Sequence, residues 1–145
     1  MAGPVIFAFV KDSLKVLRAN GTNALLGYTV NLHQTSYHSQ DLSLVERLEL
    51  YVDGRQVDPG AIDFCVNDKR FKPWELKDMY KENWSIFDDA VVEVLDFDGL
   101  AAGDHEVTLL TKTRCFRAPF DARDREPHTN ASMLVKHSET MTLHE

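Results

Sequence analysis

Hydrophobic and polar residues alternate along several short stretches of this chain, and most of these stretches end at residues that favour turns. The clearest stretch is HEVTLLTKTRCFRA, residues 105–118. A period of two residues is the pattern of a strand that buries one of its faces. Extended runs of this kind predict strands over residues 5–19, 24–32, 44–52, 61–67, 89–97 and 105–118.

Turn-forming residues separate the predicted strands. Asn20-Gly21 is the dipeptide best suited to a two-residue hairpin, so the first two runs are expected to pair with each other. Asp53-Gly54 and Asn67–Lys69 predict two more turns. Asp58–Gly60 predicts a further turn. We expect the strand before it and the strand after it to belong to the same sheet.

One short helix is predicted in a connection, in the segment PWELKDMYKENW. Pro73 suits the first turn of a helix, and Trp74, Met79 and Tyr80 follow at roughly helical spacing. The two tryptophans that flank this segment, Trp74 and Trp84, favour a place in the core or in a smaller cluster beside it. The alternative is an interface, where Trp and Tyr often contribute most of the binding energy.

The segment GLAAGDHEV, Gly99 to Val107, predicts a corner between two strands. In such a corner a leucine, here Leu100, fills the core and a glycine supplies a positive φ. A ring further along the chain then ties the loop to the backbone, as a tyrosine does in many β-sandwiches. His105 is the expected anchor.

Together these elements predict an all-β fold, an antiparallel β-sandwich of immunoglobulin or jelly-roll type with one short helix in a connection. The sandwich domain is expected over residues 1–120. From Asp121 the chain is polar and charged, contains Pro127 and has little periodicity. Residues 121–145 are therefore predicted to be a polar C-terminal tail, either disordered or an arm on another surface.

Composition excludes some classes of partner. The formal net charge of −7, without a basic cluster, argues against binding to nucleic acid or to anionic membrane surfaces. No window contains the roughly 18 apolar residues of a membrane span, and MAGPVIFAFVKD meets charge early for a secretory signal. A cytoplasmic location is expected. Cys65 and Cys115 fall within predicted strands, which favours buried, reduced thiols over a disulfide.

Candidate metal sites in the sequence are weak. His33 and His38 are close, but five residues apart on a strand they would point to opposite faces. Asp96 and Asp98 share a face and form a fragment of a calcium loop without its remaining oxygen ligands, so a solvated strand end is favoured. No metal site and no cofactor are expected in this chain.

Candidate catalytic residues are equally sparse. Ser36 and Ser39 lie near two histidines, but no glycine elbow and no placed carboxylate accompany them. TSYHSQDLS is therefore favoured as a polar loop, with contact to a ligand or partner as the alternative. No catalytic residue is assigned. The polar and aromatic residues in connections are the predicted contacts with a partner or a site entrance: His33, Ser36, Tyr37, His38, Trp74, Tyr80 and Trp84.

The order of five segments resembles the small β subunit of bacterial C-glycoside deglycosidases, over about residues 20–120. These segments are the Asn-Gly hairpin into LGYTVNL, the loop TSYHSQDLSLV, ERLELYVDGRQVDPGAIDFCVNDKRF, ELKDMYKENWSIFDDAVVEVL and DGLAAGDHEVTLLTKTRCFRAPF. The resemblance lies in their succession and spacing. In that family the loop more often carries Tyr-Tyr-Arg-Gly than the Ser36–Ser39 sequence found here.

The resemblance implies an accessory subunit of a heteromeric complex. The expected partner is a larger TIM-barrel α subunit that holds a divalent metal, Mn or Mg, together with the acid and base residues, in an assembly of several α/β pairs. The implied substrate is an aryl C-glycoside oxidised at C3 of the sugar, and the complex is a carbon–carbon lyase. Without its partner this chain is expected to be inactive.

Two other classes of function stay open. A carbohydrate-binding module would expose Trp74 and Trp84 on one flat face, with calcium near Asp96 and Asp98. A purely structural immunoglobulin-like module would have no dedicated partner.

Overall fold

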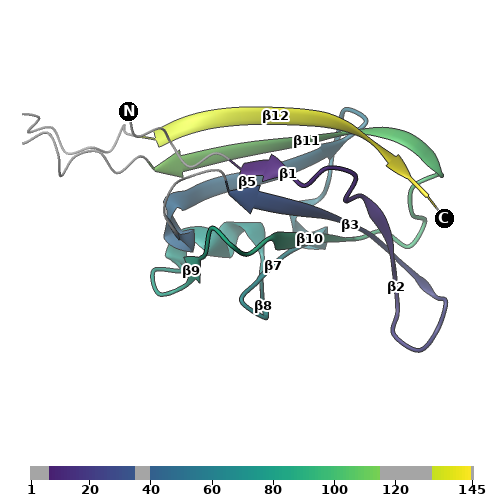
Figure 1. Ribbon diagram of the computed structural model, residues 1–145, viewed down its shortest axis with the longest axis horizontal. Coiled ribbons are helices and arrows are strands. Elements are labelled where there is room, and N and C mark those ends of the chain that lie inside the picture. Colours follow the sequence, from purple (N-terminus) through teal and green to yellow (C-terminus); the bar gives the residue numbers. More distant parts are fainter. Residues whose placement is uncertain (1–6, 35–39, 115–131, 145) are drawn as a thin grey trace, which may run out of the picture.

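Two antiparallel β-sheets lie face to face in the computed structural model, which describes residues 7–34, 40–114 and 132–144 (Figure 1). Their inner faces share one hydrophobic core, to which both sheets contribute. The predicted all-β, antiparallel fold is confirmed. The helices of the described residues are short 3₁₀ turns: η1 (Leu42–Leu44), η2 (Pro59–Ala61) and η3 (Pro73–Asp78).

The first sheet has the order β1-β3-β10-β7-β8, and β2 also pairs with β3. Its strands are β1 (Phe7–Phe9), β2 (Lys15–Arg18), β3 (Leu25–Gln34), β7 (Ile62–Val66), β8 (Lys69–Phe71) and β10 (Ala90–Leu95). Between β1 and β2 the chain bulges at Asp12, where φ is +56°. The Ser13 hydroxyl fills the gap in the ladder, because it accepts a hydrogen bond from the Asn31 N–H at 3.0 Å.

The second sheet has the order β12-β11-β5-β6. Its strands are β5 (Val45–Val52), β6 (Arg55–Gln56), β11 (Gly103–Arg114) and β12 (Ser132–Leu143). A separate two-stranded ladder joins β4 (Gln40–Asp41) to β9 (Asn83–Trp84). The positions of β5 that face the core are Val45, Leu48, Leu50 and Val52, and all four are buried.

Strand β12 corrects the expected boundary between sandwich and tail. Residues 132–143 pair with β11 in an unbroken antiparallel register from Arg114↔Ser132 to Gly103↔Leu143. Part of the predicted tail is therefore an edge strand of the second sheet, and Met141 and Leu143 are buried in the core. Residues 121–131 lie outside the described part of the chain.

The predicted turns are confirmed, but the assignment of strands to sheets needs one correction. Asn20-Gly21 joins β2 to β3, Asp53-Gly54 joins β5 to β6, and Asn67-Asp68 joins β7 to β8. Asn67 and Asp68 have φ of +57° and +59°, the conformation of a tight hairpin turn. At η2, however, the chain crosses from the second sheet to the first, so the same sheet does not continue there.

The predicted helix forms over only half of its segment. The 3₁₀ helix η3 begins at Pro73, as expected, and Glu75 accepts a hydrogen bond from the Lys72 N–H at 2.6 Å. Leu76 is the residue of this helix that is completely buried. At the end of the predicted segment the chain is extended and forms β9, because Trp84 pairs with Gln40 instead of continuing a helix.

The GLAAGDHEV corner forms as predicted. Gly99 has φ of +69°, and Leu100 packs against the core. The His105 ring contacts the Ala101 carbonyl through Nε2 and Asp53 Oδ2 through Nδ1, both at 2.6 Å. Because a carbonyl and a carboxylate only accept hydrogen bonds, both ring nitrogens donate in this arrangement. The hydrogen bond to Ala101, and then that to Asp53, raise the pKa of His105 above its ordinary value.

Candidate functional site

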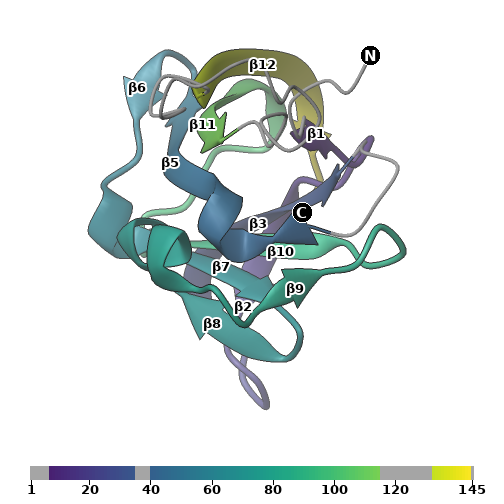
Figure 2. The ribbon, with the colours of Figure 1, turned by 90° about the vertical axis from the view of Figure 1, so that its left-hand side faces the viewer.

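Several predicted contact residues lie at one end of the sandwich, at the left in Figure 1 and facing the viewer in Figure 2. We call it the Trp84 end and define it by the last residues of β3, by β4, β9 and η3, and by the connection Ser85–Asp89. The opposite end, which carries the Gly99–His105 corner, is called the His105 end. Since β10 runs from Ala90 to Leu95, it links the two ends.

Trp84 lies in the core, so its assignment as a surface contact is wrong. Its side chain is only 1% exposed. The ring stacks on Phe7 at 4.9 Å between centroids and meets Phe64 edge to face at 5.5 Å. The indole Nε1 donates a hydrogen bond to the Asp88 carbonyl at 2.6 Å. Because its ring packs against Phe7 and Phe64 and its Nε1 is hydrogen-bonded within the protein, Trp84 is a structural residue, as the core interpretation held.

Strand β9 contacts the described residues on either side of positions 35–39, which are Gln34 and Gln40. On one side, the Gln34 side chain at the end of β3 donates a hydrogen bond to the Trp84 carbonyl. On the other side, Gln40 of β4 pairs with Trp84 in the β4–β9 ladder. Three predicted contacts, Ser36, Tyr37 and His38, belong to this segment and lie outside the described residues.

Two other predicted contacts are exposed aromatic residues on or just after η3. Trp74 is 54% exposed and Tyr80 is 63% exposed. The helix is fixed beneath them by the buried Leu76, so these rings project from a supported segment. His33 is also exposed, on β3 directly before Gln34.

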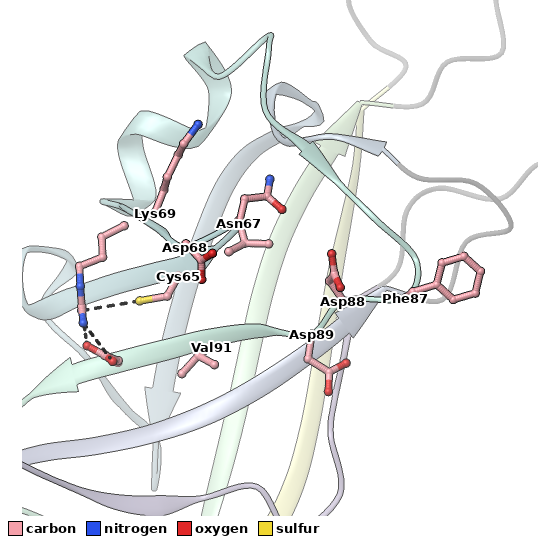
Figure 3. Close-up of a pocket in the computed structure, with 11 residues that line it drawn as sticks. Cys65, Asn67, Asp68, Lys69, Phe87, Asp88, Asp89 and Val91 are labelled. Carbon is pink, nitrogen blue, oxygen red and sulfur yellow. Dashed lines mark hydrogen bonds and ion pairs between the residues drawn. The ribbon is translucent and has the colours of Figure 1, made fainter.

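Sequence reasoning missed Phe87, which is 89% exposed. It stands in the short connection between β9 and β10, and the close-up shows its ring pointing away from the rest of the molecule (Figure 3). A phenylalanine within the polar stretch Ser85–Asp89 was the available signal, because large apolar side chains in short connections often serve contacts.

A groove of about 650 Å³ lies beside Phe87 on the outer face of the first sheet (Figure 3). Two residues of its lining, Arg70 and Glu93, form an ion pair, and Arg70 also lies 3.5 Å from Asp63, which is not part of the lining. Asp88 and Asp89 line its other side. Arg70 and Glu93 therefore offset each other, while the carboxylates outnumber the cations in the lining as a whole.

Cys65 is free, as predicted, but half-buried on the outer face of β7 instead of buried. Burial, and then the negative charge of Glu93, raise the pKa of its thiol to about 11. Its sulfur accepts a weak hydrogen bond from Arg70 at 3.7 Å. The side chain is therefore a protonated thiol at neutral pH and a poor nucleophile. Cys115 lies outside the described residues.

Of the acidic pair Asp96 and Asp98 at the His105 end, Asp96 stabilises its own loop. Asp96 Oδ1 accepts hydrogen bonds from the N–H groups of Asp98, at 3.1 Å, and Gly99, at 3.2 Å. This agrees with the prediction that LDFDG is a strand end and not a calcium loop. Over residues 7–34, 40–114 and 132–144 no three His, Cys, Asp or Glu side chains converge in a way that could hold a metal ion. Within the same residues no helix has the length and apolar character needed to cross a membrane.

Comparison with known proteins decides the family. Residues 7–116 match the family model described as C-glycoside deglycosidase beta subunit. The chain belongs to this C-glycoside deglycosidase β-subunit family. The family resemblance expected from the order of segments is thus confirmed, and the match covers every strand of the first sheet as well as β5, β6 and β11.

Two curated relatives of this β-subunit family carry names of the same kind. The chain is 26% identical over 88 residues to the C-glycoside deglycosidase beta subunit of Eubacterium cellulosolvens, which covers 61% of this chain and 60% of the relative. It is 35% identical over 71 residues to the 3'-dehydrocarminate deglycosidase beta subunit of a Microbacterium species, which covers 49% of this chain and 53% of the relative. The chain thus spans a little over half the length of these relatives.

Proposed function

We propose that this chain is the accessory β subunit of a heteromeric C-glycoside deglycosidase and that its larger partner docks at the Trp84 end. Membership of the β-subunit family is the observation that carries the proposal, since a β subunit implies a second kind of subunit. The names of both relatives agree with it.

The exposed side chains of the Trp84 end support this choice of docking surface. Trp74, Tyr80 and Phe87 are large apolar rings left mostly in solvent by the fold of this chain. Aromatic residues are enriched in protein interfaces and often contribute most of the binding energy. The groove beside Phe87 adds polar groups that can form a rim around such contacts.

The proposed reaction of the complex is cleavage of the carbon–carbon bond of a 3-keto aryl C-glycoside. The route of ordinary glycosidases is blocked, because the leaving atom is carbon and no glycosidic oxygen can be protonated. In the proposed route a base removes the proton at C2, which the neighbouring keto group makes acidic. The bond from C1 to the aryl ring then breaks, its electron pair goes to the ring carbon, and an acid protonates that carbon. The products are an unsaturated keto sugar and a free aromatic compound.

In this proposal the acid, the base and a divalent metal belong to the larger TIM-barrel subunit. The metal would supply stabilisation of the negative charge that develops on the keto oxygen. We assign no step to a side chain of the β subunit. Its proposed roles are to stabilise its partner and to shape or cover the entrance of the site.

The test is purification of the tagged chain from its source cells. The expected result is an equimolar larger protein with a bound divalent metal, and cleavage of a 3-keto C-glycoside by the pair but by neither protein alone. Recovery of a folded chain with no stoichiometric partner would overturn the proposal.

A matched pair of variants then tests the docking surface. Phe87→Ala is expected to weaken binding to the larger subunit at least about tenfold, as at an interface hot spot. Phe97→Ala removes the same side chain, which is 71% exposed, from the His105 end and is expected to leave binding unchanged. Equal effects of the two variants would remove the Trp84 end as the docking surface.

The carbohydrate-binding alternative lacks one feature that would support it. Trp74 and Trp84 do not share an exposed face, because Trp84 is buried. One carboxylate oxygen of Asp96, near the suggested calcium position, already accepts hydrogen bonds from two backbone N–H groups.

A further inference from the structure

A second cleft, of about 630 Å³, opens between the two sheets at the His105 end. We call it the Tyr28 cleft. Its lining includes Tyr28 of β3, Val94 of β10, Val57 and Ala61 on either side of Asp58, and Leu100. This volume lies in the usual range for pockets that bind small molecules.

Tyr28 carries the unusual feature of this cleft. Tyr28 is only 3% exposed, and its hydroxyl forms no hydrogen bond with any described residue. Among the described residues no fully buried side-chain oxygen or nitrogen lacks a partner, so the Tyr28 hydroxyl reaches solvent, and the cleft that Tyr28 lines is where it can do so. Burial, and then the negative charges of Asp96 and Asp53, raise the pKa of Tyr28 to about 12. Since both carboxylates line the cleft, the polar end of the ring lies on the cleft side as a neutral donor.

The charged groups around the cleft restrict what it can hold. Asp53, Asp58 and Asp96 stand against the single cation Arg55, so an anionic ligand would be repelled. Each aspartate is also engaged elsewhere: Asp53 with His105, Asp58 with the Gly60 N–H, and Asp96 with its own turn. A cation would therefore compete with existing bonds. A neutral ligand fits best.

We propose that the Tyr28 cleft binds a neutral aromatic ring that bears hydroxyl groups, with one ring oxygen hydrogen-bonded to the Tyr28 hydroxyl. The apolar walls bury the face of the ring, and the Tyr28 hydroxyl fixes its orientation. The source of such a ring rests on the proposed function. It is either the aglycone part of an aryl C-glycoside or the free phenolic product of its cleavage.

The test titrates the full-length chain with resorcinol as the probe, followed by calorimetry and by NMR of methyl groups. Saturable binding that shifts the methyl signals of Ala61, Val94 and Leu100 is expected. Benzoate, a ring with a negative charge, is expected to bind at least about tenfold more weakly. Equal binding of benzoate, or shifts that map to another face, would overturn the assignment.

Two tyrosine variants isolate the hydroxyl. Tyr28→Phe is expected to weaken resorcinol binding about fivefold or more, the change that corresponds to a hydrogen bond of about 1 kcal/mol. It should not lower stability, because no described residue bonds this hydroxyl. Tyr51→Phe is the control: it removes a hydroxyl that donates to Glu49 at 2.7 Å on the outer face of the second sheet, and it should bind resorcinol normally. Unchanged binding by Tyr28→Phe would refute the role of the hydroxyl.

A filling variant covers the case in which Tyr28→Phe alters the fold. Ala61 lines the cleft, so Ala61→Phe adds a ring to its lining and is expected to abolish binding. Retained binding would show that the ligand lies elsewhere.

Comparison of an aryl C-glycoside with free resorcinol separates the two sources of the ring. If only the free phenol binds, the cleft takes product; if the glycoside binds as well, it takes the aglycone of the substrate. If the chain binds resorcinol but forms no complex with a larger subunit, the cleft proposal stands and the proposed function is rejected. If the complex cleaves its substrate but the β subunit binds no phenol, the proposed function stands and the cleft proposal is rejected.

Discussion

The two ends of the sandwich are held by different kinds of interaction. At the His105 end, side chains bond to backbone groups and to each other within a short loop: His105 with Ala101 and Asp96 with Gly99. At the Trp84 end, a buried aromatic cluster joins residues far apart in the sequence, with Trp84 between Phe7 and Phe64. One end is fixed mainly by polar bonds, and the other by packing.

At the Trp84 end, the aromatic residues that support the fold are different from those that are exposed to solvent. Trp84 is fixed in the core by its ring and binds Gln34 and Gln40 through its backbone, while Trp74, Tyr80 and Phe87 remain mostly in solvent. Aromatic residues close in sequence thus have opposite roles. Only burial tells them apart, and substitutions should reveal the same division.

The largest expected effect is loss of the buried tryptophan. Trp84→Ala should lower the free energy of unfolding by about 3–5 kcal/mol, because it removes a large core side chain and leaves a cavity. Denaturant unfolding measures the change. Trp74→Ala is the matched control and should stay within about 0.5 kcal/mol of the wild type, since Trp74 is half exposed. Similar losses in the two variants would contradict the division between them.

A smaller effect is expected from the polar bonds at the other end. His105→Ala should cost about 1–2 kcal/mol at pH 6, because it removes the hydrogen bonds to Ala101 and Asp53. Thermal or denaturant unfolding checks this value. An unchanged stability would mean that the corner is held by Leu100 and Gly99 without the ring.

The contribution of His105 should also depend on pH. Its folded pKa is raised, so its stabilisation is fully present below the unfolded value of about 6.5 and is lost as pH rises through the folded value. The hydrogen bonds from His105 and from the Glu106 N–H lower the pKa of Asp53, whose contribution is lost only as pH falls through that lowered value. The stability difference between wild type and His105→Ala should therefore be larger at pH 5.5 than at pH 8.5. Equal differences would contradict the doubly donating ring.

The smallest expected effect compares two glycines at the His105 end. Gly99 and Gly21 have similar φ, +69° and +77°, so alanine should cost about 1 kcal/mol at either position. At Gly99 the new Cβ would also lie 2.7 Å from Leu25 Cδ2, whereas at Gly21 nothing lies within 4 Å. Gly99→Ala should therefore be the more destabilising by about 0.5–1 kcal/mol. Calorimetric melting of both variants measures the difference.

Local features of this fold could be predicted from the sequence. The hairpin at Asn20-Gly21 and the corner anchored by His105 depend on residues a few positions apart, so the determining signal lies within one short segment. The strand predicted over residues 44–52 also forms, as β5, because its apolar residues alternate with charged ones within the same short segment.

The strand β12 and the burial of Trp84 could not be predicted in this way. The core-facing side of β12 includes His137 and Glu139, which bond to each other at 3.1 Å near the sheet edge, so its hydrophobic alternation is broken. His137 packs against Phe9, a residue of the other sheet. The surroundings of Trp84 likewise come from β1 and β7, and nothing in the segment around residue 84 encodes them.

The position of β11 between β5 and β12 has a consequence for the speed of folding. Val107 must find Val52, far earlier in the chain, and also Glu139, well after it. Pairings of such long sequence separation must overcome the entropy of closing large loops before they gain any packing. Sandwiches of this kind fold in milliseconds to seconds, and until β12 arrives one edge of β11 lacks a partner. The chain is therefore most prone to aggregate during slow folding, while the edge of β11 that will pair with β12 is still unpaired.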